Sequence, residues 1–272
     1  MKDLQSHFME QAGYLEVSGK HIYTVLHKVS DPIARVLLVG PFASERQYSY
    51  IPWIRWARFL AEQRVEALRF DYRGVGESTG KFEEMTFDDW SEDVEILARW
   101  LQTQSPELPL ILHGLELGGI LASKIFAAGV GSAALFWSAP NSANEVLRTA
   151  LLHQVAVERA FKDAATRKSA SEYVRQLEEG QSLEIEGYQW SGKLWRESFQ
   201  HQFPAADEDV RRWAGERPVR LVQLDKKAAP LVGTSGLRFV SIVNPDLGDL
   251  FADNFNWIGS VLEPRGRSHN EN

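Results

Sequence analysis

The stretch LILHGLELGGILASKIF, residues 110–126, decides how the rest of the sequence is interpreted. Its first part, residues 110–113, is a short apolar run, which predicts a buried β-strand. Gly114, Gly118 and Gly119 then crowd a sharp turn, and residues 120–126 have the apolar spacing of a helix. The segment therefore predicts a strand that turns sharply into a helix.

A turn of this kind carries the nucleophile in the motif Gly-x-Ser-x-Gly. The middle residue is held in a strained conformation, and the small residues on either side let the strand and the helix approach closely. Here the turn reads Gly114-Leu115-Glu116-Leu117-Gly118, so the glycines are present and a glutamate replaces the serine. We expect a nucleophile elbow that carries the Glu116 carboxylate, with Leu115 and Leu117 beside the pocket.

A second motif lies upstream of the elbow. The loop DYRGVGES, residues 71–78, follows another apolar run and reads Asp-x-Arg-Gly-x-Gly-x-Ser. Together with the elbow it resembles the α/β-hydrolase superfamily, and the resemblance covers most of the chain outside one insert. It implies an α/β-hydrolase fold, with a mainly parallel central sheet, flanking helices and a helical cap. We expect Asp71 and Arg73 to stabilise their own loop.

The order of the apolar segments predicts the domain organisation. Strands and helices alternate up to residue 137, which is typical of a parallel sheet with right-handed crossovers. No convincing buried strand follows until residue 219, so residues 141–206 are predicted to form a helical cap over a core of residues 1–140 and 207–272. We expect Trp190 and Trp195 to line a cleft there. The expected strands lie at 14–17, 21–29, 35–39, 67–70, 110–113, 133–137, 219–224 and 237–243.

Two helix starts are also predicted. Pro52 is placed near the start of a helix that carries Trp53 and Trp56, because proline suits the first helical turn. Thr86, followed three residues later by Asp89, resembles a capping box at the start of the next helix.

Composition narrows the classes of function. The 272 residues are 44% hydrophobic and 25% charged, with a net charge of -7 and no basic run, which argues against a nucleic-acid groove or an anionic membrane surface as partner. The absence of cysteine excludes disulfides, thiol nucleophiles and cysteine metal sites. The first residues lack the apolar core of a signal peptide, and residues 118–137 are interrupted by Lys124 and turn residues. We expect a cytoplasmic protein without a membrane span.

The chemistry usual for this fold needs a serine, a histidine, an acid and an oxyanion hole. Glu116 occupies the serine position, and Asp225 is the candidate acid after the penultimate strand. The loop at residues 244–249 should supply the histidine but contains none, and the only later histidine is His269. In the oxyanion loop Pro41, after Gly40, has no N–H to donate, although Phe42 could donate if the register shifts by one.

Because these parts depend on one another, losing several together predicts the loss of conventional triad activity. The leading interpretation is a protein of ester or acyl hydrolase ancestry that binds a small acyl-type ligand in the capped pocket, or a partner protein or second copy across the cap. The alternative is an active hydrolase of an ester, thioester or epoxide, with Glu116 as nucleophile or base. Asp225 or Asp246 would then support Glu116, and His153 or His201 of the cap would replace the missing histidine.

The other conspicuous residues are interpreted structurally. His113 ends the strand before the elbow, where a packed or hydrogen-bonded role is expected. His153 and His201 lie in the predicted cap, and their spacing does not indicate a metal site. No cofactor and no metal are therefore expected.

A narrower resemblance involves three separated segments. The runs LVGPFASE at 38–45 and LEEGQSLEIEGY at 177–188, with the altered elbow, look like the hydrolase-like proteins encoded beside exosortase A systems. That resemblance implies a bacterial cytoplasmic protein associated with envelope or exopolysaccharide gene clusters. Such proteins also tend to lack the elbow serine, and the resemblance implies no particular reaction.

Overall fold

The computed structural model describes residues 8–17, 19–41, 43–204, 212–224 and 247–263. Its centre is a seven-stranded sheet in the order β1-β2-β4-β3-β5-β6-β9. The pairs β1–β2 and β2–β4 are antiparallel, and the remaining pairs are parallel. The strands are β1 (Phe8–Val17), β2 (Lys20–Val29), β3 (Ala34–Val39), β4 (Val65–Phe70), β5 (Leu110–Leu115), β6 (Ala133–Trp137) and β9 (Val219–Val222).

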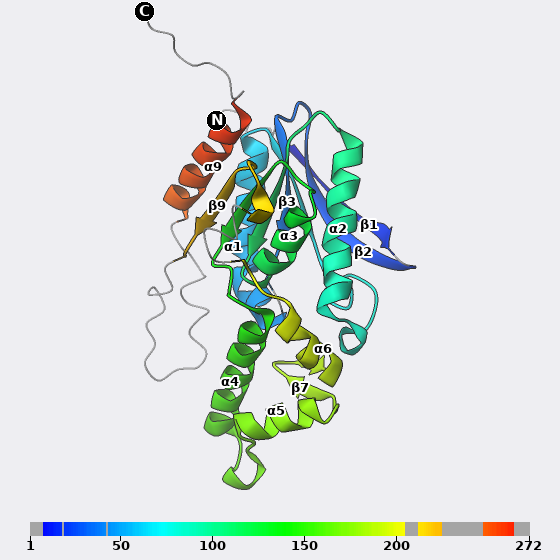
Figure 1. The fold of residues 1–272 in the computed structure, drawn as a ribbon, viewed down its shortest axis with the longest axis vertical. Coiled ribbons are helices and arrows are strands. Elements are labelled where there is room, and N and C mark those ends of the chain that lie inside the picture. Colours follow the sequence, from blue (N-terminus) through cyan, green and yellow to red (C-terminus); the bar gives the residue numbers. More distant parts are fainter. Residues whose placement is uncertain (1–7, 18, 42, 205–211, 225–246, 264–272) are drawn as a thin grey trace, which may run out of the picture.

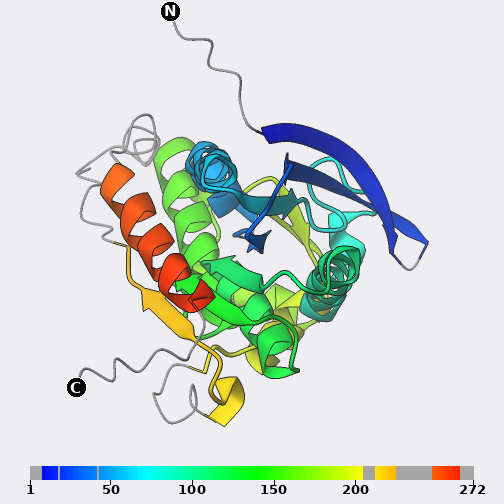
Figure 2. The same cartoon turned by 90° about the horizontal axis from the view of Figure 1, so that it is seen from above.

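Helices cover both faces of this sheet (Figures 1 and 2). On one face lie α1 (Ala43–Glu62) and α9 (Gly248–Leu262), whose Trp56 and Phe251 belong to one apolar core. On the other face lie α2 (Phe87–Gln104) and α3 (Leu117–Ala127), whose Trp90 and Phe126 belong to a second core. Strands β3, β5 and β6 are buried at every position, as a sheet covered on both faces requires. The predicted layers and mainly parallel sheet are confirmed.

The two predicted helix starts have different outcomes. Helix α2 begins after Thr86 with the expected capping box, because Thr86 accepts from the Asp89 N–H and the Asp89 carboxylate accepts from the Thr86 N–H. Helix α1, however, begins at Ala43, so Pro52 lies inside it and the predicted start is wrong. Proline removes one helical hydrogen bond, but Trp53 and Trp56, which follow Pro52 in the helix, are buried and pack this part of α1 into the apolar core.

The chain leaves β6 at its carboxyl end and forms a separate group of elements beyond the sheet (Figure 1). These are α4 (Ala143–Phe161), η2 (Ala164–Thr166), α5 (Ala170–Glu178), β7 (Leu183–Ile185), β8 (Tyr188–Trp190), α6 (Gly192–Glu197) and η3 (Ser198–Gln200). The short 3-10 turn η1 (Phe82–Glu84) precedes α2.

This segment corrects two expectations. It contains a hairpin of β7 and β8, joined by Glu186 and Gly187 with φ of 51° and 80°. Two positive φ angles in a two-residue connection are the requirement of a tight hairpin turn, so the expectation of a segment without strands is wrong. Trp190 and Trp195 do not line a cleft, because both are fully buried in the second core.

Among the described residues, no helix is both long and apolar enough to cross a bilayer. The strand expected at 237–243 lies outside the described residues, and the division into core and cap remains a prediction.

Candidate functional site

The turn between β5 and α3 has the strained geometry of a nucleophile elbow. Glu116 is the N-cap residue of α3, with φ 52° and ψ −123°. A positive φ at a residue other than glycine costs on the order of 1–3 kcal/mol and persists only where neighbouring structure enforces it. The Glu116 N–H donates to the Trp137 carbonyl at 2.9 Å, and the Gly119 N–H donates to the Glu116 carbonyl at 2.9 Å. The strained position is thus retained with a glutamate in it.

The three glycines of the turn explain how strand and helix come so close. A Cβ on Gly114 would lie 2.4 Å from the Gly119 Cα. On Gly118 it would lie 2.0 Å from the Val39 carbonyl oxygen, and on Gly119 it would lie 2.6 Å from the Ala139 Cβ. None of these spaces admits a side chain, so the predicted close approach is confirmed.

His113 lies beneath the turn in an aromatic enclosure. It is 0% exposed, and the Trp56 Nε1–H donates to its Nδ1 at 2.9 Å. The rings of Trp53 and Trp137 pack against it at centroid distances of 5.0 and 4.5 Å. Burial holds the pKa of His113 well below its usual value, so the imidazole is neutral at pH 7. The expected packed and hydrogen-bonded role is confirmed.

The predicted oxyanion loop borders a small cavity. Arg46 on α1 forms an ion pair with Asp71, whose second oxygen accepts from the Glu77 N–H at 3.0 Å. The Tyr72 hydroxyl donates to the Gly40 carbonyl at 2.8 Å. The cavity has a volume of about 30 Å³, which is room for very few water molecules. Its lining includes Gly40, Pro41, Arg46, Tyr50, Trp53, Arg69, Asp71 and Tyr72.

Of the remaining predicted site residues, the structure describes two and leaves three outside the described residues. Leu115 and Leu117 are buried in the two apolar cores on opposite faces of the sheet, and their role beside a pocket stays a prediction. Phe42, Asp225 and Asp246 lie outside the described residues.

The loop after β4 is fastened by Arg73. Its backbone N–H donates to Asp93 Oδ2 at 2.9 Å, its guanidinium pairs with Asp93, and it also reaches Glu92 at 2.6 Å. The Arg73 carbonyl accepts from the Trp90 Nε1–H at 3.0 Å. Burial raises the pKa of Asp93 to about 6, although Arg73 opposes the shift. The loop-stabilising role expected for Arg73 is confirmed.

The two histidines of residues 141–206 contact other groups. His153 Nδ1 pairs with Glu186 at the hairpin turn. His201 Nε2 lies 3.4 Å from Glu197 and 3.6 Å from Asp88. Asp88 also pairs with Lys124, which lies eight residues beyond Glu116 along α3 and therefore about 12 Å further along its axis. These contacts hold His201 at a position remote from the elbow.

Sequence reasoning misses this group of Asp88, Glu197 and His201. Glu197 and His201 are four residues apart, which is a visible spacing for side chains on one helical face. Asp88 joins them only through the fold, because it precedes Glu197 by 109 residues.

Comparison with known proteins supports the α/β-hydrolase fold. The sequence model of the family described as serine aminopeptidase, S33 matches residues 53–185, which include the elbow. Among solved structures, the α/β hydrolase GrgF from Penicillium sp. sh18 superposes with a TM-score of 0.57 at 14% identity, over 93% of this chain and 99% of that one. The chain has an α/β-hydrolase fold.

Two further α/β-hydrolase structures are comparably similar. The monoglyceride lipase from Saccharomyces cerevisiae has a TM-score of 0.57 at 12% identity, over 93% of this chain and 95% of that one. Est1E from Butyrivibrio proteoclasticus has a TM-score of 0.56 at 12% identity, over 92% and 98%. No curated protein sequence matches this chain. The resemblance at this level of identity concerns the α/β-hydrolase fold alone.

Proposed function

We propose that this α/β-hydrolase-fold protein is a non-catalytic binding protein of ester or acyl hydrolase ancestry. Its ligand is a small acyl-type molecule held at the elbow, or a partner protein held across residues 141–206. One observation carries the proposal: the strained nucleophile position holds Glu116, while the described histidines contact other residues.

The contacts of four described histidines support the proposal that none of the four serves as the proton-transferring base. His113 is neutral and enclosed, with its Nδ1 accepting from Trp56. His27 is buried between Glu10 and Arg69 on the hairpin side of the sheet. His153 and His201 pair with carboxylates of other elements. A serine-type mechanism needs a histidine within hydrogen-bond reach of the nucleophile, and the contacts of these four favour other roles.

The small cavity at the predicted oxyanion loop also supports binding without turnover. The cavity of about 30 Å³ is bordered by the Arg46–Asp71 ion pair. Ligand pockets of enzymes that enclose drug-sized molecules are roughly 300–1,000 Å³, so a bulky ester does not fit without movement of this pair. A short acyl group or a carboxylate would require less displacement of the Arg46–Asp71 pair and therefore suits this site better.

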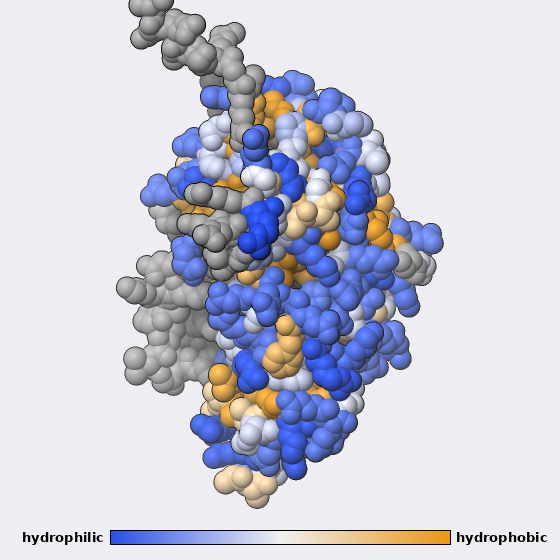
Figure 3. Space-filling model, in the orientation of Figure 1, coloured by the Kyte–Doolittle hydropathy of each residue, from blue (hydrophilic) through white to orange (hydrophobic). Residues whose placement is uncertain are grey.

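The class of ligand is suggested by proteins of the same fold. Est1E was solved with ferulic acid bound, and the yeast monoglyceride lipase with a substrate analogue. On the face shown in Figure 3 the surface is mostly hydrophilic, and the apolar side chains form small separate patches. A partner docking on that face would therefore bind mainly through polar contacts.

The proposal also covers the compartment of the protein and the genes that lie near its own. The resemblance of residues 38–45 and 177–188 to proteins encoded beside exosortase A systems supports a bacterial cytoplasmic protein near envelope or exopolysaccharide gene clusters. A second copy of the chain is a partner to test by light scattering at several concentrations.

The alternative is a hydrolase that uses the carboxylate, and the retained backbone strain favours it. In that reaction a Glu116 oxygen attacks an epoxide carbon, the C–O bond of the ring breaks, and the ring oxygen takes a proton from water. The product is a glutamyl ester, which persists if no histidine activates water to cleave it. A covalent adduct on Glu116 would therefore be detectable.

The test compares the purified protein with Glu116→Gln against short and medium acyl esters, thioesters and epoxides, with intact mass recorded for both. The yeast monoglyceride lipase serves as the positive control for the esters. We expect no turnover and no adduct in either form of the protein, and a rise in melting temperature with a short acyl carboxylate. Turnover or an adduct that disappears in Glu116→Gln would establish the carboxylate enzyme instead.

A second variant tests the missing base directly. Glu116→Ser places the usual nucleophile at the elbow, whose backbone already has the required angles. We expect no ester hydrolysis above the level of the unchanged protein, because a serine without a base is a weak nucleophile. Clear esterase activity in Glu116→Ser would show that a base does reach the elbow.

A further inference from the structure

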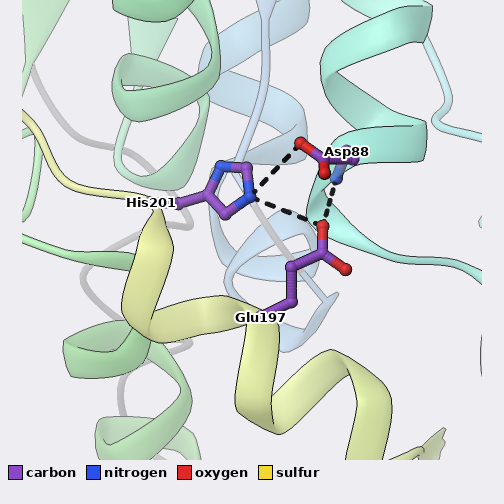
Figure 4. A group of neighbouring side chains, drawn as sticks. All are labelled: Asp88, Glu197 and His201. Carbon is purple, nitrogen blue, oxygen red and sulfur yellow. Dashed lines mark hydrogen bonds and ion pairs between the residues drawn. The ribbon is translucent and has the colours of Figure 1, made fainter.

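The group formed by Asp88, Glu197 and His201 joins two parts of the chain that are distant in sequence. Asp88 lies in the first turn of α2, Glu197 ends α6, and His201 follows η3. Figure 4 shows the His201 ring directed at both carboxylates. One candidate ligand atom from each residue lies within 4.8 Å of the other two.

The separations fit a metal ion better than direct hydrogen bonds. His201 Nε2 is 3.4 Å from Glu197 Oε1 and 3.6 Å from Asp88 Oδ1. Hydrogen bonds between charged groups are usually about 2.7–2.9 Å. Around zinc, bonds of about 2.0–2.1 Å in a tetrahedron place neighbouring ligand atoms about 3.3 Å apart. The two distances to His201 are close to the edges of such a tetrahedron.

The types of donor atom and the burial of His201 also favour a metal ion at this position. His201 is only 5% exposed, and its ring packs against Phe87 at 5.4 Å. Imidazole nitrogen with two carboxylates is a donor set that suits zinc and related divalent ions. The Asp88 N–H donates to Glu197 Oε1 at 2.6 Å, which orients that carboxylate and leaves it a lone pair for a metal.

We propose that Asp88, Glu197 and His201 form a binding site for a divalent transition-metal ion, of which zinc is the best fit. The ion joins the start of α2 to the end of residues 141–206. Among the described residues three protein donors converge here, which leaves a fourth position for water. A neighbouring cavity of about 360 Å³, lined in part by His201, Lys124 and Gln202, gives the ion a path to the site.

Lys124 is the group that competes with the metal. Its Nζ lies 2.8 Å from Asp88 Oδ1 and partly neutralises the cluster. The Lys124 side chain is 51% exposed, so it can swing into solvent when a metal binds. Removing this charge should therefore strengthen metal binding, whereas removing any of the three donors should weaken it.

The experiment uses the full chain without a histidine tag, freed of metal by a chelator and titrated with zinc chloride by calorimetry. We expect one zinc per chain and a rise in melting temperature. His201→Gln should bind zinc more than about 10-fold more weakly. His153→Gln, which changes a histidine paired with Glu186, is the matched control and should bind as the unchanged protein does.

Two further variants keep the test decisive. Asp88→Asn changes a side chain that is 67% exposed, so it gives a second donor deletion should His201→Gln fail to fold. Lys124→Gln should bind zinc several-fold more tightly because the competing charge is gone. The proposal is overturned if the unchanged protein takes up no zinc, if both donor variants bind it equally well, or if His153→Gln abolishes binding.

Discussion

At the scale of single residues, the elbow combines a strained backbone conformation with a glutamate in the position of the usual serine. Glu116 keeps φ 52° and ψ −123°, although the serine that usually needs this conformation is gone. The conformation persists because Gly114 and Gly118 allow the backbones of strand and helix to touch. The glycines of the elbow thus serve the close packing of β5 against α3.

Gly118→Ala tests this packing role. The added Cβ would lie 2.0 Å from the Val39 carbonyl oxygen and 2.6 Å from that of Gly40, so the backbone must shift. We expect the free energy of unfolding to fall by more than about 2 kcal/mol, measured by urea denaturation with circular dichroism. Gly259→Ala in α9 is the control, since nothing lies within 4 Å of its Cβ position. That variant should gain up to about 1 kcal/mol; equal effects in both variants would refute the steric argument.

At the scale of elements, the first turn of α2 has two roles. Thr86 and Asp89 close its capping box, and Asp88 reaches out to Lys124 and His201. The capping box holds the helix start at a defined residue, so it also sets the position of Asp88. Local helix chemistry therefore supports a contact made with a segment more than a hundred residues away.

Thr86→Ala should cost about 1 kcal/mol in unfolding free energy, because the Asp89 N–H loses its acceptor. Thr103→Ala at the exposed end of the same helix is the control and should change stability by less than about 0.5 kcal/mol. The comparison is made by urea denaturation monitored with tryptophan fluorescence. A cost in Thr103→Ala as large as that in Thr86→Ala would contradict the capping role.

At the scale of the whole molecule, buried histidines should make the fold sensitive to acid. Burial, the largest cause, lowers the pKa of His27 to about 4, and His113 is shifted well below its usual value. The unfolded chain binds these protons near pH 6.5, so the unfolding free energy is fully retained above that pH and falls as pH drops toward 4. Each proton that the unfolded chain binds in excess of the folded chain lowers the unfolding free energy by up to about 1.4 kcal/mol per pH unit as the pH falls.

His27→Gln should flatten this dependence, since one proton-binding difference disappears while an amide oxygen can still accept from Arg69. The unfolding free energy is measured at pH 7, 6 and 5 for the variant and the unchanged protein. Asp93 acts with the opposite sign, because its raised pKa of about 6 favours the folded state as pH falls. The quantity to compare is therefore the difference in unfolding free energy between His27→Gln and the unchanged protein at each pH. His21→Gln controls for loss of an exposed histidine. Identical slopes with and without His27 would contradict the prediction.

Much of the fold could be predicted because its signals are local. The apolar runs at β3, β5 and β6 and the capping box at Thr86 are each read from neighbouring residues, and the structure places them as expected. The errors arise where packing overrides a local signal. Helix α1 passes through Pro52 because Trp56 is buried beside it, and the hairpin turn at Glu186 and Gly187 lacks the asparagine-glycine pair usual at such turns.

The sequence by itself determined the strand, turn and helix of the elbow, the replacement of its serine by Glu116, and the lack of a histidine at residues 244–249. These follow from residue type and spacing along the chain. Only the tertiary structure decided that Trp190 is buried, that Trp56 is the hydrogen-bond donor to His113, and that Asp88 lies close to His201. Such contacts depend on how distant elements pack, because side chains far apart in sequence share no periodicity that records their meeting.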